Sequence, residues 1–340
     1  MPDHSGAASH AAVLQHTWAP ADSVRQGLGD SAHLLGSVRY GGRSHPVASS
    51  GAEDVHVALD AAEDAGWREC WYSPVPVKHL QHGPLQARHN QHVMWGHLSL
   101  TVPLGQSCVA AVRQHYLHLL DFLQQTGFVH LWRVWNFIPH INALDEQGQE
   151  TYRAFNQGRA AAFSQVFDNG RQDLSQATQY MPAATGVGCQ GDTLHIYFLA
   201  GGQPGSHIEN PRQQPAYHYP EEYGPQPPGF ARASSVDVQG QRMLFVSGTA
   251  SIIGHQTVHV GNLEGQCRTA MENLQIVAER TGRSLQQLNH FKVYIRHPHD
   301  LPTVKMLLPP MLGVSADALA CFVAATCRQN LLMEIEGMQL

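Results

Sequence analysis

Short runs of alternating hydrophobic and polar residues lie between residues 34 and 102, separated by residues typical of turns. Such alternation predicts β-strands, because successive side chains of a strand point to opposite faces of the sheet. The predicted strands of this sheet cover residues 34–40, 55–59, 67–72 and 93–102. The residues before them show no sustained period, so we expect residues 1–30 to be loosely ordered.

Helical spacing replaces the alternation farther along the chain. Apolar side chains recur every three or four positions over residues 108–123, which predicts an amphipathic helix that stops at Gly127. A strand over residues 131–138 and a helix over residues 149–167 follow. A strand over residues 189–198 closes the first half.

The second half repeats this order of elements. The predicted elements are a strand over 243–249, a helix over 266–280, a strand over 291–296, a helical or irregular piece over 301–312 and a closing strand that contains residues 333–336. Two β-β-α-β-α-β units in tandem predict duplication of an α+β domain, with the helices packed on one face of each sheet.

The closing strand carries two carboxylates on one of its faces. At strand period Met333 and Ile335 lie on one face, while Glu334 and Glu336 lie on the other. We interpret this pattern as a sheet whose second face lines a cavity; the alternative is an edge strand with solvated glutamates. Burial would raise the pKa of Glu334 and suit it to general acid catalysis. The first copy of the repeat has His195 at this position, so chemistry is expected in one copy only.

Composition narrows the range of partners. The formal net charge is -6 and no run of lysine or arginine occurs, which argues against nucleic acid or a membrane surface as partner. No apolar stretch reaches the roughly eighteen residues that span a bilayer, and no signal pattern is present, so we expect a cytoplasmic protein. The six cysteines include no C-x-x-C pair and the 23 histidines are scattered, so no metal site is predicted.

Three segments of the second half resemble the Rid (YjgF-type) fold. They are residues 227–233 (PPGFARA), residues 244–248 (LFVSG) and the closing Glu-Ile-Glu at 334–336. The single-domain imine deaminases of that family carry an arginine before the first glutamate, which binds the substrate carboxylate. The corresponding region here reads Leu-Ala-Cys at residues 319–321, which weakens the deaminase interpretation.

The whole chain resembles the chorismatases more closely. The segments that carry this resemblance are residues 152–159 (YRAFNQGR), 210–213 (NPRQ), 217–220 (YHYP) and 229–233 (GFARA), together with Cys327 and Glu334. The resemblance implies an α+β fold made by tandem duplication of a Rid-like (chorismate-mutase-like) β-sheet. It implies a degenerate Rid-like domain over residues 31–200, a linker over 201–229 that contributes to the site, and a Rid-like domain over 230–340.

The resemblance also implies a reaction, the cleavage of chorismate to pyruvate and an aromatic or diene acid without a cofactor. Glu334 would be the general acid that protonates the enolpyruvyl methylene. In this family a cysteine at the position of Cys327 marks the branch that makes 3-hydroxybenzoate, a starter unit for polyketides in secondary metabolism, and an alanine marks the branch that makes a dihydroxycyclohexadiene carboxylate. From the residues alone, Cys327 is better interpreted as a small buried hydrophobe, as most free cysteines are, and only the resemblance favours an active role.

Chorismate is a dianion, and the sequence offers cationic and aromatic residues to bind it. Tyr152, Asn156 and Arg159 fall on one face of the helix predicted over residues 149–167, so Arg159 and Tyr152 are predicted to clamp one carboxylate. Arg212 and Arg232 are candidates for the other carboxylate.

Further candidates line the same predicted site. Tyr217 and Tyr219 alternate with a histidine and, in an extended segment, would close the site as a lid. Gly248 would present backbone groups to the ligand, unless it is simply a sheet glycine. These assignments place the pocket between the two halves, so a monomer suffices to build it. A chorismatase that makes the diol, a Rid-type imine deaminase and a non-catalytic small-molecule binding protein remain as alternatives.

Overall fold

The structure is a computed structural model of the chain, and it describes residues 12–20, 32–41, 55–61, 66–167 and 181–340. The loose order expected for residues 1–11 and 21–30 lies outside the described residues. The statements below concern the described residues.

The first half forms a six-stranded sheet with two helices on one face. The helices are α1 (Val109–Thr126) and α2 (Thr151–Phe167), and α1 stops where Gly127 adopts a left-handed conformation, as predicted. In spatial order the strands are β10 (Ala183–Cys189), β9 (His130–Pro139), β11 (Thr193–Gly201), β8 (Val93–Thr101), β7 (Leu85–His89) and β6 (Lys78–His82).

The second half forms a seven-stranded sheet, and its helices are α3 (Leu263–Arg280) and α4 (Leu301–Leu312). In spatial order the strands are β12 (Ser206–Ile208), β13 (Ala233–Val238), β14 (Gln241–Thr249), β19 (Met333–Gln339), β17 (His290–Ile295), β18 (Leu319–Val323) and β4 (Asp60–Ala61). A hairpin of β15 (Ile252–Ile253) and β16 (Gln256–Thr257) lies beside it. The predicted linker thus supplies β12, and β4 crosses over from the predicted first domain.

Each unit contains strands that the sequence did not predict, namely β7 and β10 in the first unit and β13 and β18 in the second. After the second helix, β10 runs parallel to β9 in the first unit, and β18 runs parallel to β17 in the second. Both strands were missed because a strand buried on both faces shows no polar alternation. In β10 the sequence AATGVGC is also poor in large apolar residues. The repeat itself is confirmed, with ββαβαββ units in place of the predicted shorter ones.

A separate four-stranded sheet corrects two further expectations. Its strands, in spatial order, are β1 (Gln15–Pro20), β5 (Trp67–Ser73), β2 (His33–Tyr40) and β3 (Val55–Val57). The strands predicted up to residue 102 therefore belong to two sheets. The expectation of loose order is wrong for β1, which pairs with β5 along its whole length.

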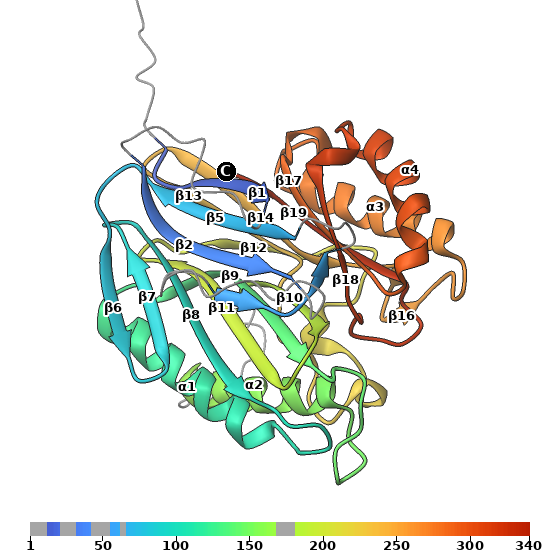
Figure 1. Cartoon of the computed structure of the whole chain (residues 1–340), viewed down its shortest axis with the longest axis horizontal. Coiled ribbons are helices and arrows are strands. Elements are labelled where there is room, and N and C mark those ends of the chain that lie inside the picture. Colours follow the sequence, from blue (N-terminus) through green and yellow to red (C-terminus); the bar gives the residue numbers. More distant parts are fainter. Residues whose placement is uncertain (1–11, 21–31, 42–54, 62–65, 168–180) are drawn as a thin grey trace, which may run out of the picture.

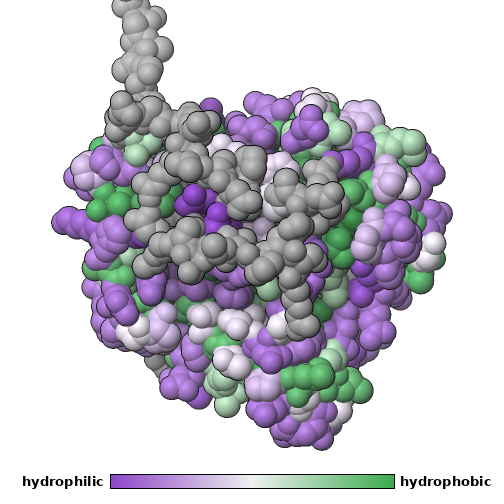
Figure 2. Space-filling view, viewed as in Figure 1, coloured by the Kyte–Doolittle hydropathy of each residue, from purple (hydrophilic) through white to green (hydrophobic). Residues whose placement is uncertain are grey.

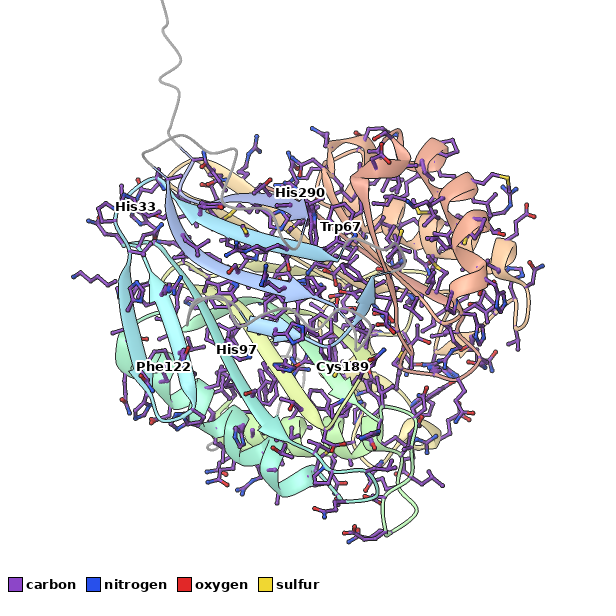
Figure 3. The ribbon with its side chains drawn as sticks, viewed as in Figure 1. His33, Trp67, His97, Phe122, Cys189 and His290 are labelled. Carbon is purple, nitrogen blue, oxygen red and sulfur yellow. The ribbon has the colours of Figure 1, made fainter. Side chains whose placement is uncertain are left out.

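The two large sheets face each other, and their helices lie on opposite outer sides of the molecule (Figure 1). Aromatic side chains fill the space between the sheets, among them Trp135, Phe137, Tyr197, Phe245 and Tyr294. The four-stranded sheet closes this layer. It contacts the seven-stranded sheet through His290 of β17, labelled in Figure 3, whose Nδ1 lies 3.1 Å from Nδ1 of His16 in β1. The outer face in Figure 2 is largely hydrophilic, with hydrophobic residues in small groups. Polar side chains in the inner layer, among them Glu69, Lys292 and Glu336, are buried.

Candidate active site

A cavity of about 910 Å³ lies between the two halves of the chain. It is bounded by α2, by β10, by the end of the linker, by β14 and by the strand β19 with the loop that precedes it. Most of the predicted site residues line it: Tyr152, Arg159, Tyr219, Arg232, Gly248, Cys327 and Glu334. The predicted position of the pocket between the halves is therefore found in the structure.

Two predicted residues, Arg212 and Tyr217, are not among those that line the cavity. The Arg212 guanidinium instead pairs with Glu272 of α3, with 2.7 Å between Nη1 and Oε2. The segment around Tyr217 is not extended but forms a 3-10 turn over Ala216–His218. Tyr217 therefore does not share a face with Tyr219, and only Tyr219 reaches the cavity.

The closing strand β19 presents its two faces as its sequence predicted. Met333 and Ile335 pack in the core beneath α3 and α4. Glu334 points the other way, into the cavity, and is 4% exposed. Burial, and next the negative charge of Glu336, raise the pKa of Glu334 to about 8. Glu334 is therefore a carboxylic acid with a proton to donate at neutral pH.

Gly248 makes room for this carboxyl group. A Cβ atom added to Gly248 would lie 1.8 Å from Oε1 of Glu334, so no larger residue fits without displacing it. The pairing of β14 with β19 shifts register between Val246 and Thr249, which places Gly248 in the irregular stretch. The backbone N–H of Gly248 donates to Oγ1 of Thr185, 3.1 Å away, so this group is already engaged.

Glu336 lies deeper in the same layer and has several partners. Its carboxylate accepts hydrogen bonds from Nη2 of Arg133 at 2.8 Å and from Nε1 of Trp135 at 2.7 Å, and it lies 3.2 Å from Nζ of Lys292. Burial opposes ionisation, but Lys292 and Arg133 outweigh it and lower the pKa of Glu336. Glu336 is thus a fixed negative charge held by these cations, which suits a structural role.

The face of α2 predicted to bind a carboxylate does line the cavity. Tyr152, Asn156 and Arg159 all reach it. Arg159 is 4% exposed, and its Nη1 donates to the carbonyl oxygen of Gly229. Among the described residues, Nε and Nη2 of Arg159 and Nδ2 of Asn156 have no hydrogen-bond partner. Buried donors without partners are rare in proteins, and here they point to an acceptor supplied by a ligand.

Arg232 forms a second buried cation. Its Nη2 donates to the Tyr219 hydroxyl and to the carbonyl oxygen of Gln214, each at 2.9 Å. Its Nε has no hydrogen-bond partner within the described part of the chain, and the nearest acid oxygen, Oε2 of Glu209, is 3.9 Å away. The cavity therefore contains two desolvated guanidinium groups with free donors and one protonated carboxyl group.

Known proteins are similar to this chain in sequence and in architecture. Residues 69–200 match the family described as chorismatase FkbO/Hyg5-like, N-terminal. The 3-hydroxybenzoate synthase of Streptomyces hygroscopicus is 35% identical over 322 residues, which cover 90% of this chain and 91% of that protein. This chain belongs to the chorismatase family. A chorismatase of the same organism is 35% identical over 319 residues, covering 90% of this chain and 89% of that one.

A crystal structure of a chorismatase has the same fold as this member of the family. The two superpose with a TM-score of 0.85 at 30% sequence identity, over 96% of this chain and 98% of the other. The family and the α+β fold class inferred from sequence are thereby confirmed.

Sequence reasoning missed two cations of the chorismatase cavity, Arg153 and Arg328. Arg153 is paired, with its Nε 3.4 Å from Oε2 of Glu150. Arg328 has no such acidic partner among the described residues.

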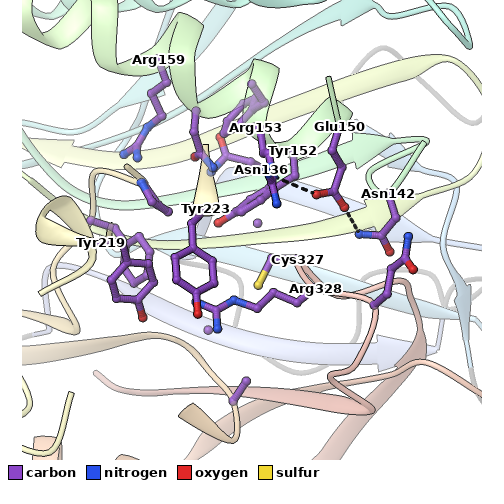
Figure 4. Close-up of a pocket in the computed structure, with 18 of the residues that line it drawn as sticks. Asn136, Asn142, Glu150, Tyr152, Arg153, Arg159, Tyr219, Tyr223, Cys327 and Arg328 are labelled. Atoms are coloured by element: carbon purple, nitrogen blue, oxygen red, sulfur yellow. Dashed lines mark hydrogen bonds and ion pairs between the residues drawn. The ribbon is translucent and has the colours of Figure 1, made fainter. Parts of the chain in front are cut away.

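The guanidinium carbon of Arg328 lies 4.0 Å from the ring centre of Tyr223 and 5.3 Å from that of Tyr219. Its Nη1 donates to the carbonyl oxygen of His255 at 2.8 Å. Figure 4 shows Arg328 beside Cys327, across the cavity from α2. The sequence offers one indication that Arg328 reaches the cavity, which is its position directly after Cys327.

The thiol of Cys327 is held in its neutral form. Burial, and next the nearby Glu334, raise the pKa of Cys327 to about 12. A thiolate nucleophile is therefore disfavoured at neutral pH, because the thiolate is the reactive form of cysteine. Cys327 can act on a ligand as a neutral, polarisable group at the cavity wall.

Two other features of the described residues bear on function. No group of three or more His, Cys, Asp or Glu side chains among them is arranged to hold a metal ion. None of the helices in the described part of the chain is both long and apolar enough to span a membrane.

Proposed function

We propose that this protein cleaves chorismate to pyruvate and 3-hydroxybenzoate and so supplies a starter unit for polyketide synthesis. The observation that carries the proposal is the protonated Glu334 in a cavity that also holds buried arginines with unpaired donors. The names of the relatives, a 3-hydroxybenzoate synthase and a chorismatase, agree with this assignment.

The charge of the cavity suits the substrate. Chorismate has one carboxylate on its ring and one on its enolpyruvyl ether. Arg159 and Arg232 each have at least one buried N–H group without a partner in the described structure. Hydrogen bonds between guanidinium and carboxylate groups are strong and directional, and two of them fix a dianion in one orientation. Arg328 and Arg153 add positive charge at the cavity wall.

Glu334 begins the reaction by donating its proton to the terminal methylene of the enol ether. The ether carbon then takes on oxocarbenium character, and the neighbouring ring hydroxyl attacks the ring carbon that bears the ether. The carbon–oxygen bond to that ring carbon breaks, its electron pair stays on the departing oxygen, and pyruvate leaves as the ketone. The hydroxyl gives up its proton to the carboxylate that Glu334 has become, which restores the acid. A neutral carboxylic acid is the suitable donor here because it does not add a negative charge beside a dianion.

The fate of the ring decides the product. Opening of the resulting arene oxide with loss of a ring proton gives 3-hydroxybenzoate, and the sum of this product and pyruvate has the composition of chorismate. The diol branch instead adds one water molecule. Cys327 lies at the cavity wall, where it limits access of water to the ring and steers opening toward the aromatic acid.

Incubation of the purified protein with chorismate tests the proposal. Liquid chromatography with mass detection should show pyruvate and 3-hydroxybenzoate in equal amounts, and Glu334→Gln should lower kcat by about a hundredfold or more. Glu272→Gln, which removes an acid on α3 outside the cavity, is the matched control and should turn over like the wild type. Near wild-type turnover by Glu334→Gln would exclude the acid role, and deamination of an imino acid without turnover of chorismate would exclude the proposed reaction.

A further inference from the structure

Arg296 follows β17 and holds the loop of residues 324–332 between β18 and β19. Its Nε donates to the carbonyl oxygen of Leu331 at 2.9 Å, and its Nη2 donates to Oγ1 of Thr326 at 2.8 Å and to the carbonyl oxygen of Arg328 at 2.7 Å. A longer contact of 3.3 Å joins Nη2 to the Thr326 carbonyl oxygen. One guanidinium group therefore engages three residues of one loop.

This loop brings Cys327 and Arg328 to the cavity wall (Figure 4). Cys327 itself lies between Thr326 and Arg328, both of which accept hydrogen bonds from Arg296. The backbone on either side of the thiol is thus fixed by the same side chain. Arg296 is not among the residues that line the cavity, so any influence on the reaction acts through the loop.

Arg296 also ties the loop to the other half of the chain. Its Nη1 donates to Oδ1 of Asn142, 3.3 Å away, in the segment between β9 and α2. Nδ2 of Asn142 donates in turn to the Thr326 carbonyl oxygen at 3.3 Å and to Oε1 of Glu150 at 3.0 Å. Glu150 immediately precedes α2, the helix that carries Tyr152 and Arg159. The position of Cys327 is thereby set relative to the helix proposed to bind the substrate.

We propose that Arg296 is a positioning residue for product choice, because it fixes Cys327 and Arg328 relative to α2. This inference rests on the proposed function. The arrangement requires an arginine, since its donors span acceptors on Leu331, Thr326, Arg328 and Asn142, whereas a lysine presents its three donors from one point.

Product analysis of Arg296→Lys and Arg296→Met tests the proposal. We expect Arg296→Met to lower kcat/KM about tenfold and to raise the diol fraction, because small misplacements of groups around a bound substrate are costly. Arg296→Lys should fall between this variant and the wild type. The control is Arg283→Met, which removes another partly buried arginine that bonds to Gln339 at the other end of β19. It should leave the product ratio unchanged.

Alkylation of Cys327 gives a readout that does not need turnover. Peptide mass spectrometry after treatment with iodoacetamide should show Cys327 reacting several-fold faster in both Arg296 variants than in the wild type, because the loop is held less tightly. Cys267 and Cys321, both buried in the second core, serve as references for intact folding. If the wild-type protein does not cleave chorismate, the proposed function is wrong. The alkylation rate of Cys327 still tests whether Arg296 holds the loop of residues 324–332. A folded Arg296→Lys with wild-type product ratio and alkylation rate overturns the inference.

Discussion

Glu334 and Glu336 lie two residues apart on the same face of β19, yet their surroundings move their pKa values in opposite directions. Burial and the neighbouring charge raise the pKa of Glu334 to about 8. Lys292 and Arg133 compensate the burial of Glu336 and lower its pKa. One carboxyl group therefore keeps a proton for donation, and the other is an ionised partner of the cations. The ionised one also helps to keep the first protonated.

Turnover should fall as pH rises through about 8, because only protonated Glu334 can donate to the substrate. The basic limb of kcat, measured with chorismate from pH 6 to pH 10, should follow the loss of one proton. A kcat that stays constant up to pH 10 would contradict the assignment of the acid.

The same carboxyl group makes stability depend on pH. Its pKa is higher in the folded than in the unfolded chain, so the folded state binds the proton more tightly, and stability is lost as pH rises toward about 8. Between the ordinary pKa of 4.5 and about 8, each pH unit lowers the free energy of unfolding by about 1.4 kcal/mol. Glu334→Gln does not lose stability in this way, because glutamine carries no titrating group. Its Tm relative to wild type should therefore be higher at pH 8 than at pH 5, and a difference independent of pH would refute the raised pKa.

Glu336→Gln should destabilise the protein and shift the pH profile. Arg133 would lose its carboxylate partner. Lys292 would lose one of its two carboxylates, keeping Glu69 at 2.9 Å and the Tyr197 hydroxyl at 2.7 Å. The free energy of unfolding in urea should therefore fall by about 3–5 kcal/mol. Removal of the negative charge should also lower the pKa of Glu334 and move the basic limb of kcat to lower pH. Glu272→Gln breaks a partly exposed pair and should cost under about 1 kcal/mol. If the basic limb of kcat stays at the same pH, the charge of Glu336 does not raise the pKa of Glu334.

Gly248→Ala should impair chemistry more than folding. The added methyl group would overlap Oε1 of Glu334, so the carboxyl group must turn away from its position in the cavity. We expect kcat to fall at least about tenfold, with a smaller change in KM. Gly202→Ala is the matched comparison, because Gly202 does not line the cavity and its Cβ would lie 3.7 Å from the carbonyl oxygen of Gly127, an ordinary contact. Equal losses in the two variants would argue against the displacement of Glu334.

Local periodicity was sufficient to predict the parts of the site that lie on single elements. The faces of β19 and of α2 follow from spacing along the sequence, and Glu334, Tyr152 and Arg159 all reach the cavity. His195, at the corresponding strand position of the first half, lies instead 3.4 Å from His97.

The sequence left open which of the candidate cations reach the cavity, because this depends on how distant elements pack in the tertiary structure. Arg212 and Arg232 looked equivalent as candidates for a carboxylate, and only the position of α3 gives Arg212 a partner in Glu272. Arg328 reaches the cavity because the loop before β19 folds over it, which no periodicity records. The extra strands β10 and β18 were missed because buried parallel strands lack alternation.

Arg159 and Arg212 should respond differently to the same substitution. Arg159→Met removes a cation with two unpaired nitrogen donors in the described structure, so KM for chorismate should rise about tenfold or more. Its stability should not fall greatly, since a buried charge without an anionic partner is itself unfavourable. Arg212→Met affects a pair outside the cavity and should leave both constants near wild type. Steady-state kinetics and urea unfolding check both variants, and a higher KM in Arg212→Met alone would reverse the assignment.

Cys327→Ala should change the product rather than stop turnover. The pKa of the thiol is raised to about 12, so wild-type Cys327 acts without a thiolate, and its removal leaves the acid Glu334 in place. The smaller side chain opens the cavity wall to water, and we expect part of the product to become the dihydroxycyclohexadiene carboxylate. Chromatography of the products, with pyruvate release as the measure of total turnover, gives the ratio directly. Cys327→Ser keeps a small polar group and should shift the ratio less. Unchanged product from Cys327→Ala at normal turnover would remove the steering role, whereas complete loss of pyruvate release would indicate covalent or acid–base participation of the thiol.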